Sequence, residues 1–156
     1  MHNVPFTHQV TYMDTTTTAR LFSILQSTDN EDELQLFLEK IDPYQQNLDF
    51  QSYFTMLLEK YKKDKAAVIA GSNIERTYGY QIISGLKKPG RDKVILLALS
   101  VGCSLDETQR LLRAAQAPLL YSKNRRDAVI IFSINKSLSP GDANALLEEF
   151  EMSVLN

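Results

Sequence analysis

Polar side chains recur at helical spacing between positions 76 and 84 of this 156-residue sequence. A helix predicted over residues 75–84 would carry them on one side. All five bear hydrogen-bonding groups: Arg76, Thr77, Tyr80, Gln81 and Ser84. An arginine can donate two parallel hydrogen bonds to the edge of a guanine, and a glutamine can form two hydrogen bonds with an adenine. This face therefore predicts contact with base edges, and the alternative is an ordinary solvated helix face.

Two short helices joined by a tight turn are predicted to position this face. Asp64 can cap the first helix, because its carboxylate can accept hydrogen bonds from N–H groups of the first turn. Asn73 marks the turn, since asparagine adopts the left-handed conformation at little cost. We expect the second helix to end at Gly85. Its other side is apolar, with Ile74 buried beneath the turn and followed by Tyr78, Ile82 and Ile83.

The charge of the chain is strongly polarised. Residues 1–59 carry two basic and nine acidic side chains, a net charge of −7. Residues 60–126 carry fourteen basic and five acidic side chains, a net charge of +9, and residues 127–156 have a net charge of −4. The positive block contains the predicted helix pair and the loop that follows it. This coincidence is typical of a phosphate-binding surface, and the alternative is chance or a role in solubility.

The residues from Ile74 to Gly85, with Lys87, Lys88 and Pro89 after them, resemble the recognition helix and exit loop of λ-repressor/Cro-like (XRE-type) helix-turn-helix proteins. The resemblance covers roughly residues 50–117. It implies a five-helix domain whose second helix of the pair enters the major groove of DNA. The expected base contacts are Arg76, Thr77, Tyr80 and Gln81. The expected phosphate contacts are Lys65, which the resemblance places at the groove edge, together with Ser84, Lys87, Lys88 and Arg91.

The sequence departs from the usual family pattern at three positions. Asn73 stands where the family most often has glycine, which its tolerance of the left-handed conformation accommodates. Ile69 replaces a small alanine at the helix crossing, and Gly79 replaces a β-branched core residue. We therefore hypothesise that Ile69 and Gly79 lie against each other, so that the two size changes compensate.

Residues 1–48 are predicted to form an acidic helical extension of the DNA-binding domain, with residues 1–14 flexible. Helices are expected at residues 19–26 and from about residue 30 to residue 41, where apolar residues recur at helical spacing. Glu31, Asp32 and Glu33 crowd the start of the second helix, where negative charge suits the helix dipole. The extension can serve simple packing, form a partner or dimer surface, or compete with DNA for the basic face.

A repeat follows the predicted helix-turn-helix domain, which spans residues 49–117. Residues 91–120 align without a gap to residues 126–155, so residues 118–156 are predicted to form a second helical hairpin that packs on the first. Whether this hairpin also builds a dimer interface remains open. For Lys123, Arg125 and Arg126, contacts to the DNA backbone and ion pairs with Asp127 or neighbouring acids both remain open. The identical pairs are Arg91/Arg126, Asp92/Asp127, Val94/Val129, Ile95/Ile130, Ser104/Ser139, Leu111/Leu146, Leu112/Leu147 and Leu120/Leu155.

Enzymatic and metal-dependent functions find little support in the sequence. Cys103 is the only cysteine and the only histidines are His2 and His8, so no disulfide framework or metal-ligand spacing exists. A glycine-rich phosphate loop is also absent. We expect no catalytic residue, no metal and no cofactor, and we expect Cys103 to be a small buried group. No apolar run is long enough for a membrane span and no signal-peptide pattern appears, so a cytoplasmic protein is expected.

These observations predict an all-α protein: a λ-repressor-like helix-turn-helix domain with an N-terminal helical extension and a C-terminal helical hairpin. The predicted function is sequence-specific binding of double-stranded DNA, as a homodimeric transcriptional regulator. Repression is the commoner mode in the family. A protein–protein adaptor that uses this fold without binding DNA is the alternative. In that case the N-terminal or C-terminal helices would contact a protein partner.

Overall fold

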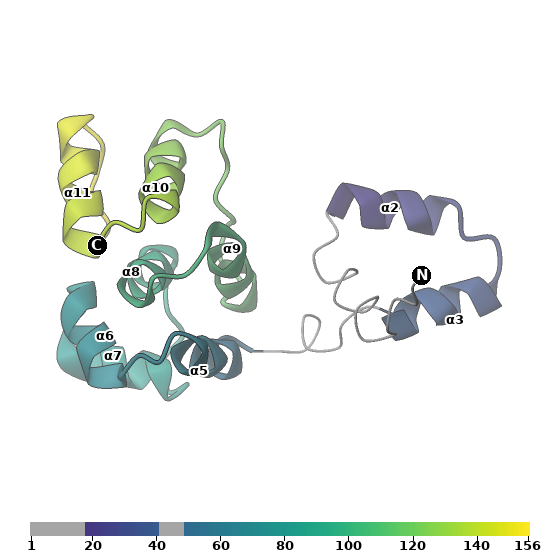
Figure 1. Cartoon of the computed structure of the whole chain (residues 1–156), viewed down its shortest axis with the longest axis horizontal. Coiled ribbons are helices and arrows are strands. Elements are labelled where there is room, and N and C mark those ends of the chain that lie inside the picture. Colours follow the sequence, from purple (N-terminus) through teal and green to yellow (C-terminus); the bar gives the residue numbers. More distant parts are fainter. Residues whose placement is uncertain (1–17, 41–48) are drawn as a thin grey trace, which may run out of the picture. The chain divides into compact units, whose positions relative to one another are not determined.

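A computed structural model describes residues 18–40 and 49–156, and every regular element in these ranges is an α-helix (Figure 1). The predicted all-α class is thereby confirmed for the described residues. Two compact units make up the chain, residues 1–48 and residues 49–156. No described helix is long and apolar enough to cross a membrane. The predicted flexibility of residues 1–14 concerns positions outside the described residues.

The N-terminal unit contains α2 (Thr18–Gln26) and α3 (Glu31–Lys40). Asn30 caps α3, because its side-chain oxygen accepts a hydrogen bond from the backbone N–H of Glu33 at 2.9 Å. The Glu33 carboxylate accepts one in turn from the backbone N–H of Asp29 at 2.9 Å. Phe37 is buried, whereas the Phe22 side chain is 63 % exposed. Local capping chemistry therefore fixes where α3 begins.

The second unit begins with five helices: α5 (Phe50–Lys60), α6 (Lys65–Ser72), α7 (Arg76–Ile83), α8 (Arg91–Val101) and α9 (Leu105–Ala114). The centre of this unit is α8, which packs on both α6 and α9. Every residue from Val94 to Leu99 is buried, so α8 is surrounded on nearly all sides. α6 therefore packs directly on this core, and α7 packs on α6 and α5.

The end of α9 is set by a residue in the left-handed conformation. The helix ends at Ala114, because Gln116 adopts the left-handed conformation with φ 58°. The backbone N–H of Ala117 then donates to the carbonyl oxygen of Leu112 at 2.9 Å, which satisfies a carbonyl of the last turn. Gln116 thus takes the left-handed position that glycine commonly occupies at helix ends.

A buried carboxylate ties α9 to α5. Glu107 forms a capping box with Ser104, and both reciprocal hydrogen bonds are present. The same carboxylate accepts hydrogen bonds from Lys60 Nζ and Tyr61 Oη at the end of α5, each at 2.5 Å. Burial by itself would raise the pKa of Glu107, but these hydrogen bonds and the one from Ser104 N–H hold the pKa below its ordinary value. Glu107 is therefore both a helix cap and a cross-link between helices.

The first hairpin consists of α8 and α9, and the second consists of α10 (Arg125–Asn135) and α11 (Pro140–Glu149), drawn in green and yellow in Figure 1. Ser139 caps α11, and Pro140 occupies the first position of the helix, where its missing N–H costs no hydrogen bond. In the packing of the two hairpins, α10 lies on α9 while α11 lies on α8. The first helix of each hairpin thus packs on the second helix of the other, so an approximate two-fold rotation relates the two hairpins. In a translational repeat, by contrast, the second hairpin would present the same contact surface to a third copy.

Candidate nucleic-acid interface

The turn between α6 and α7 comprises residues 73–75 and has the predicted geometry. Asp64 caps α6, with its carboxylate 3.4 Å from the backbone nitrogen of Ala67. Asn73 adopts the left-handed conformation, with φ 65° and ψ 14°. Ile74 is buried beneath the turn, and its N–H donates to Ser72 Oγ at 3.2 Å. The local sequence signals therefore set the angle at which α7 leaves α6.

Glu75 caps α7. Its carboxylate accepts hydrogen bonds from the backbone N–H groups of Thr77 and Tyr78, both at 2.9 Å. These backbone bonds hold the pKa of Glu75 below its usual range, so the group is ionised at neutral pH. Two of the free N–H groups at the start of α7, those of Thr77 and Tyr78, are thus already paired with a carboxylate.

The hypothesised contact between Ile69 and Gly79 is confirmed. A Cβ atom added to Gly79 would lie 2.7 Å from Cγ2 and 3.1 Å from Cγ1 of Ile69. Ile69 is only 2 % exposed, so it has little room to move away. The large residue on α6 therefore fills the space left by the missing side chain on α7, and the two helices approach closely at this point.

The outer face of α7 is accessible. Arg76, Thr77 and Ser84 are exposed, Gln81 is half-buried, and Tyr80 retains 36 % of its surface. The guanidinium carbon of Arg76 lies 6.0 Å from the centroid of the Tyr80 ring, within range of a cation–π interaction. The cationic group of Arg76 is thereby placed beside the phenol on the same face.

A hollow in the surface brings six of the nine predicted contact residues together. Lys65, at the start of α6, lies at its edge next to the residues of α7. The hollow thus places the four predicted base contacts next to two predicted phosphate contacts, Lys65 and Ser84. The lining consists of Lys65, Arg76, Thr77, Tyr80, Gln81, Ile83 and Ser84.

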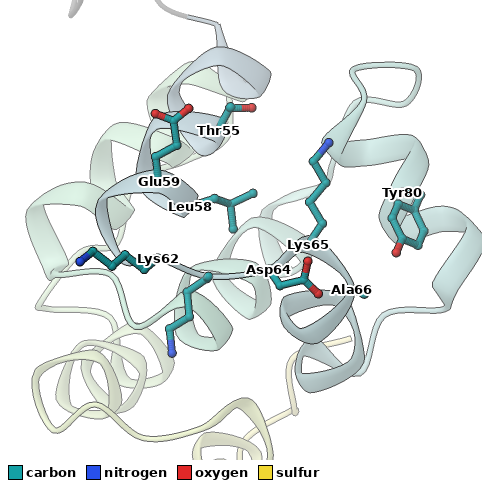
Figure 2. Close-up of a pocket in the computed structure, with 9 residues that line it drawn as sticks. Thr55, Leu58, Glu59, Lys62, Asp64, Lys65, Ala66 and Tyr80 are labelled. Atoms are coloured by element: carbon teal, nitrogen blue, oxygen red, sulfur yellow. The ribbon is translucent and has the colours of Figure 1, made fainter.

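A second hollow adjoins the first, because both include Lys65 and Tyr80. Figure 2 shows Lys65 extending from the first turn of α6, with Lys62 on the segment that leaves α5. Lys62 and Lys63 line this hollow but were not among the predicted contacts. The signal that could have identified them is the run of lysines at positions 60, 62, 63 and 65. The acids Glu59 and Asp64 also line the hollow and reduce its positive charge.

The loop between α7 and α8 carries the predicted phosphate-binding residues Lys87 and Lys88. Both are exposed, and Lys88 Nζ donates a hydrogen bond to Oε1 of Gln116 at 2.7 Å. Lys87 is therefore the freer of the two. The loop extends the basic surface past the end of α7.

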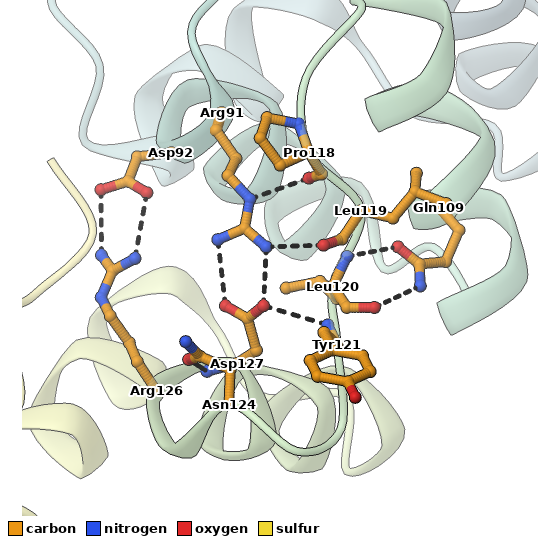
Figure 3. A network of polar contacts seen from close by, with 10 residues as sticks. All are labelled: Arg91, Asp92, Gln109, Pro118, Leu119, Leu120, Tyr121, Asn124, Arg126 and Asp127. Carbon is orange, nitrogen blue, oxygen red and sulfur yellow. Dashed lines mark hydrogen bonds and ion pairs between the residues drawn. The ribbon is translucent and has the colours of Figure 1, made fainter.

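Arg91 has a structural role that the sequence did not indicate. Its guanidinium pairs with Asp127 through Nη1 at 3.0 Å and Nη2 at 2.8 Å, as Figure 3 shows. The repeat-equivalent Arg126 pairs with Asp92 through Nη2 at 3.0 Å and Nη1 at 3.3 Å. Each hairpin thus gives an arginine to the other and receives one from it. This reciprocity agrees with the two-fold relation of the helices.

The two arginines also hold equivalent pieces of backbone. Each guanidinium donates to two carbonyl oxygens 27 and 28 positions further along the chain. The donors Nε, Nη1 and Nη2 of Arg91 are therefore all occupied within the protein, and a phosphate would have to compete with these partners. The carbonyls belong to Pro118 and Leu119 for Arg91, and to Ser153 and Val154 for Arg126.

Within residues 18–40 and 49–156, no group of three or more His, Cys, Asp or Glu side chains could hold a metal ion. Cys103 is buried, as predicted, and burial raises the pKa of its thiol to about 12. The thiol is thus protonated at neutral pH and a poor nucleophile. The carboxylate of the buried Glu107 accepts hydrogen bonds from Lys60 and Tyr61 at the end of α5 and from the Ser104 N–H that begins α9.

Comparisons with models of known protein families, with curated proteins and with solved structures found no match.

Proposed function

We propose that this protein binds double-stranded DNA in a sequence-specific manner and acts as a transcriptional regulator, with repression favoured over activation because it is the commoner mode in the family that the sequence resembles. The observation that carries the proposal is the hollow in which Lys65 of α6 lies with Arg76, Thr77, Tyr80 and Gln81 of α7. In this proposal α5 to α9 are the five helices of a λ-repressor-like (XRE-type) domain, and α7 is the recognition helix.

The size of α7 suits the major groove. An α-helix with its side chains is about 10–12 Å wide, and the major groove of B-DNA is about 12 Å wide. The exposed Arg76 is assigned to a guanine and the half-buried Gln81 to an adenine, because these are the base edges their donors and acceptors match. Thr77 and Tyr80 complete the base-reading set.

Phosphate contacts are assigned to residues on either side of α7. Lys65 and Ser84 lie at the hollow itself, and Lys87 and Lys88 follow on the exposed loop. Lys62 and Lys63 extend the set along the adjoining hollow. Cations in these places fix the register of the protein on DNA without reading sequence. A contact by Arg91 remains a prediction that requires its guanidinium to leave Asp127 or the chain carbonyls.

The proposal includes a homodimer, because two copies of a helix-turn-helix domain read two half-sites related by symmetry. Salt distinguishes it from the alternative, an adaptor that binds protein and no DNA. Binding through several phosphates weakens steeply as salt rises, since condensed counterions are released.

The test is a selection of fragments from a random duplex DNA pool by the full chain, followed by fluorescence anisotropy on the enriched sequence. The double variant Arg76→Ala/Gln81→Ala is expected to lose the preference for this sequence and to retain weak, salt-sensitive binding. The matched control is Arg113→Ala/Asn135→Ala, which removes an exposed arginine and an exposed amide from α9 and α10. Equal binding by both variants, or no enrichment by the wild type, would refute base reading by α7.

A further inference from the structure

The second hairpin exposes a face whose counterpart in the first hairpin is buried. Phe132 and Phe150 are 49 % and 52 % exposed. The residues 35 positions earlier are Leu97 and Ala115, which are 0 % and 3 % exposed. Leu146 is half-buried, whereas its counterpart Leu111 is fully buried. The face defined by Phe132, Asp142, Leu146, Glu149 and Phe150 is called the outer face below.

In the first hairpin, the corresponding part of α9 is covered by α5. The two helices pack on each other, and Glu107 of α9 receives Lys60 and Tyr61 from the end of α5. Ala115, near the other end of α9, lines a hollow together with Phe50 at the start of α5. The first hairpin thus binds an amphipathic helix through apolar contacts and through one carboxylate that receives a lysine.

The outer face repeats these elements along α11. Residues 142, 145, 146, 149 and 150 follow the i, i+3, i+4, i+7, i+8 spacing of one continuous helical stripe. Asp142 occupies the place of Glu107, and its N–H is likewise held by the capping serine, Ser139, at 3.1 Å. Among the described residues, no cationic side chain pairs with the Asp142 carboxylate. Phe150 replaces the small Ala115 and enlarges the apolar area.

We propose that the outer face of the second hairpin is a docking surface for a helix of another protein, one with an apolar stripe and a cationic residue, in the way that α9 accepts α5. The negative charge of the second hairpin favours a cationic partner helix. Residues 127–156 have a net charge of −4, and Asp142, Glu148, Glu149 and Glu151 are exposed. A second copy of the same face would bring these acids together, which is unfavourable. The acidic first turn of α3 makes the chain's own N-terminal unit an equally poor match.

The experiment uses the isotope-labelled full chain without DNA, so its outcome is independent of the proposed DNA binding. The probe is a synthetic peptide with the sequence of residues 49–63, which carries the apolar stripe of α5 and Lys60, Lys62 and Lys63. We expect saturable shifts of NMR amide signals in α10 and α11. Asp142→Lys is expected to weaken binding about tenfold, and Lys60→Glu in the peptide to restore affinity for that variant.

Glu148→Lys is the matched control, because it makes the same charge change on α11 away from the stripe. Its counterpart Arg113 is exposed in the first hairpin and is not covered by α5. Phe150→Ala tests the apolar contribution and should also weaken binding. The proposal is overturned if the peptide does not bind, if it shifts α9 instead, or if Asp142→Lys and Glu148→Lys have equal effects.

Two other occupants have distinct signatures in the free protein. If Phe150→Asp abolishes self-association measured by sedimentation, the outer face binds a second copy of the chain. If the same variant shifts the amide signals of residues 18–40, the face binds the chain's own N-terminal unit. Either result would replace the proposed partner helix.

Discussion

Ile69 of α6 occupies the space beside Gly79 of α7, where a Cβ atom would come within 2.7 Å of Ile69 Cγ2. Ile69 is branched at Cβ and buried, so it cannot rotate out of the way at little cost. The pair acts as one unit of packing, and the effect of changing either residue depends on the other.

The effect of Gly79→Ala on the free energy of unfolding should therefore change sign when Ile69 is replaced by alanine. Gly79→Ala in the wild type is expected to lower the free energy of unfolding by about 1–3 kcal/mol through overpacking. In an Ile69→Ala background the same change is expected to raise it, because the new methyl group fills part of the cavity and alanine favours the helix by about 1 kcal/mol. Urea denaturation of the four proteins measures the coupling, and additive effects would contradict the contact.

The two reciprocal ion pairs should differ in their contributions to stability. Asp127 is the more buried carboxylate, with its side chain 7 % exposed, against 25 % for Asp92. Asp127→Ala leaves Arg91 partly buried without its partner and is expected to cost about 3 kcal/mol. Asp92→Ala breaks the equivalent, more solvated pair and should cost about 1 kcal/mol. Thermal unfolding of both variants gives the comparison, and equal losses would show that burial does not set the difference.

Acid should weaken the cross-link between α5 and α9. The folded pKa of Glu107 is depressed below its ordinary value of 4.5, so its stabilising contribution is complete above that value and is lost as pH falls through the folded pKa. The difference in unfolding free energy between wild type and Glu107→Gln should thus shrink as the pH falls below the ordinary value of 4.5 and through the folded pKa. Urea titrations at several pH values measure it. A difference that stays constant over this range would mean that the ionised carboxylate is not the stabilising species.

The turn between α6 and α7 offers a test of backbone strain. Asn73→Ala places a residue with a Cβ and no stabilising side-chain polarity at φ 65°, and is expected to cost about 1 kcal/mol. Asn73→Gly removes the steric penalty and should be close to neutral or slightly stabilising. Thermal denaturation of the two variants separates the conformational effect from loss of the side chain. If glycine were as destabilising as alanine, the asparagine side chain itself would be responsible.

Salt dependence reports individual phosphate contacts. If Lys65 binds a phosphate, Lys65→Ala should reduce the slope of log affinity against log salt by about 0.9. The preference of the Lys65→Ala variant among DNA sequences should be unchanged, because phosphate contacts carry no base information. Lys136→Ala, at an exposed position after α10, is the control and should leave the slope unchanged. A lost sequence preference in Lys65→Ala would instead assign this lysine to base reading.

Local signals made much of the helix pair predictable. Asp64, Asn73 and the Ser104–Glu107 capping box each act through backbone groups within a few residues, so their chemistry is visible in the sequence. The contact of Ile69 with Gly79 was also predictable. Ile69 is larger and Gly79 is smaller than the residue usual in the family, and two opposite changes in size compensate only if the residues touch. The core side of α7 was predicted less well, since Tyr78 is only half-buried and lies beneath Lys93 Nζ at 5.9 Å.

Long-range geometry accounts for what the sequence could not give. The repeat identified Arg91, Asp92, Arg126 and Asp127 as equivalent residues, but equivalence alone does not distinguish translation from rotation. The sequence therefore predicted a phosphate contact for Arg91, whereas in the fold its guanidinium pairs with Asp127. Which acids receive the cations depends on how two distant hairpins meet, and no local pattern records that.

The rotational relation between the hairpins also affects how this part of the molecule responds to dilution. Two separate subunits that associated through such an interface would dissociate as the protein concentration fell. Here a short connection joins the partners, so each experiences the other at an effective concentration on the order of millimolar, whatever the amount of protein in the sample. Assembly of the paired hairpins is therefore unimolecular, and any concentration dependence in the melting of this protein must arise at a different surface.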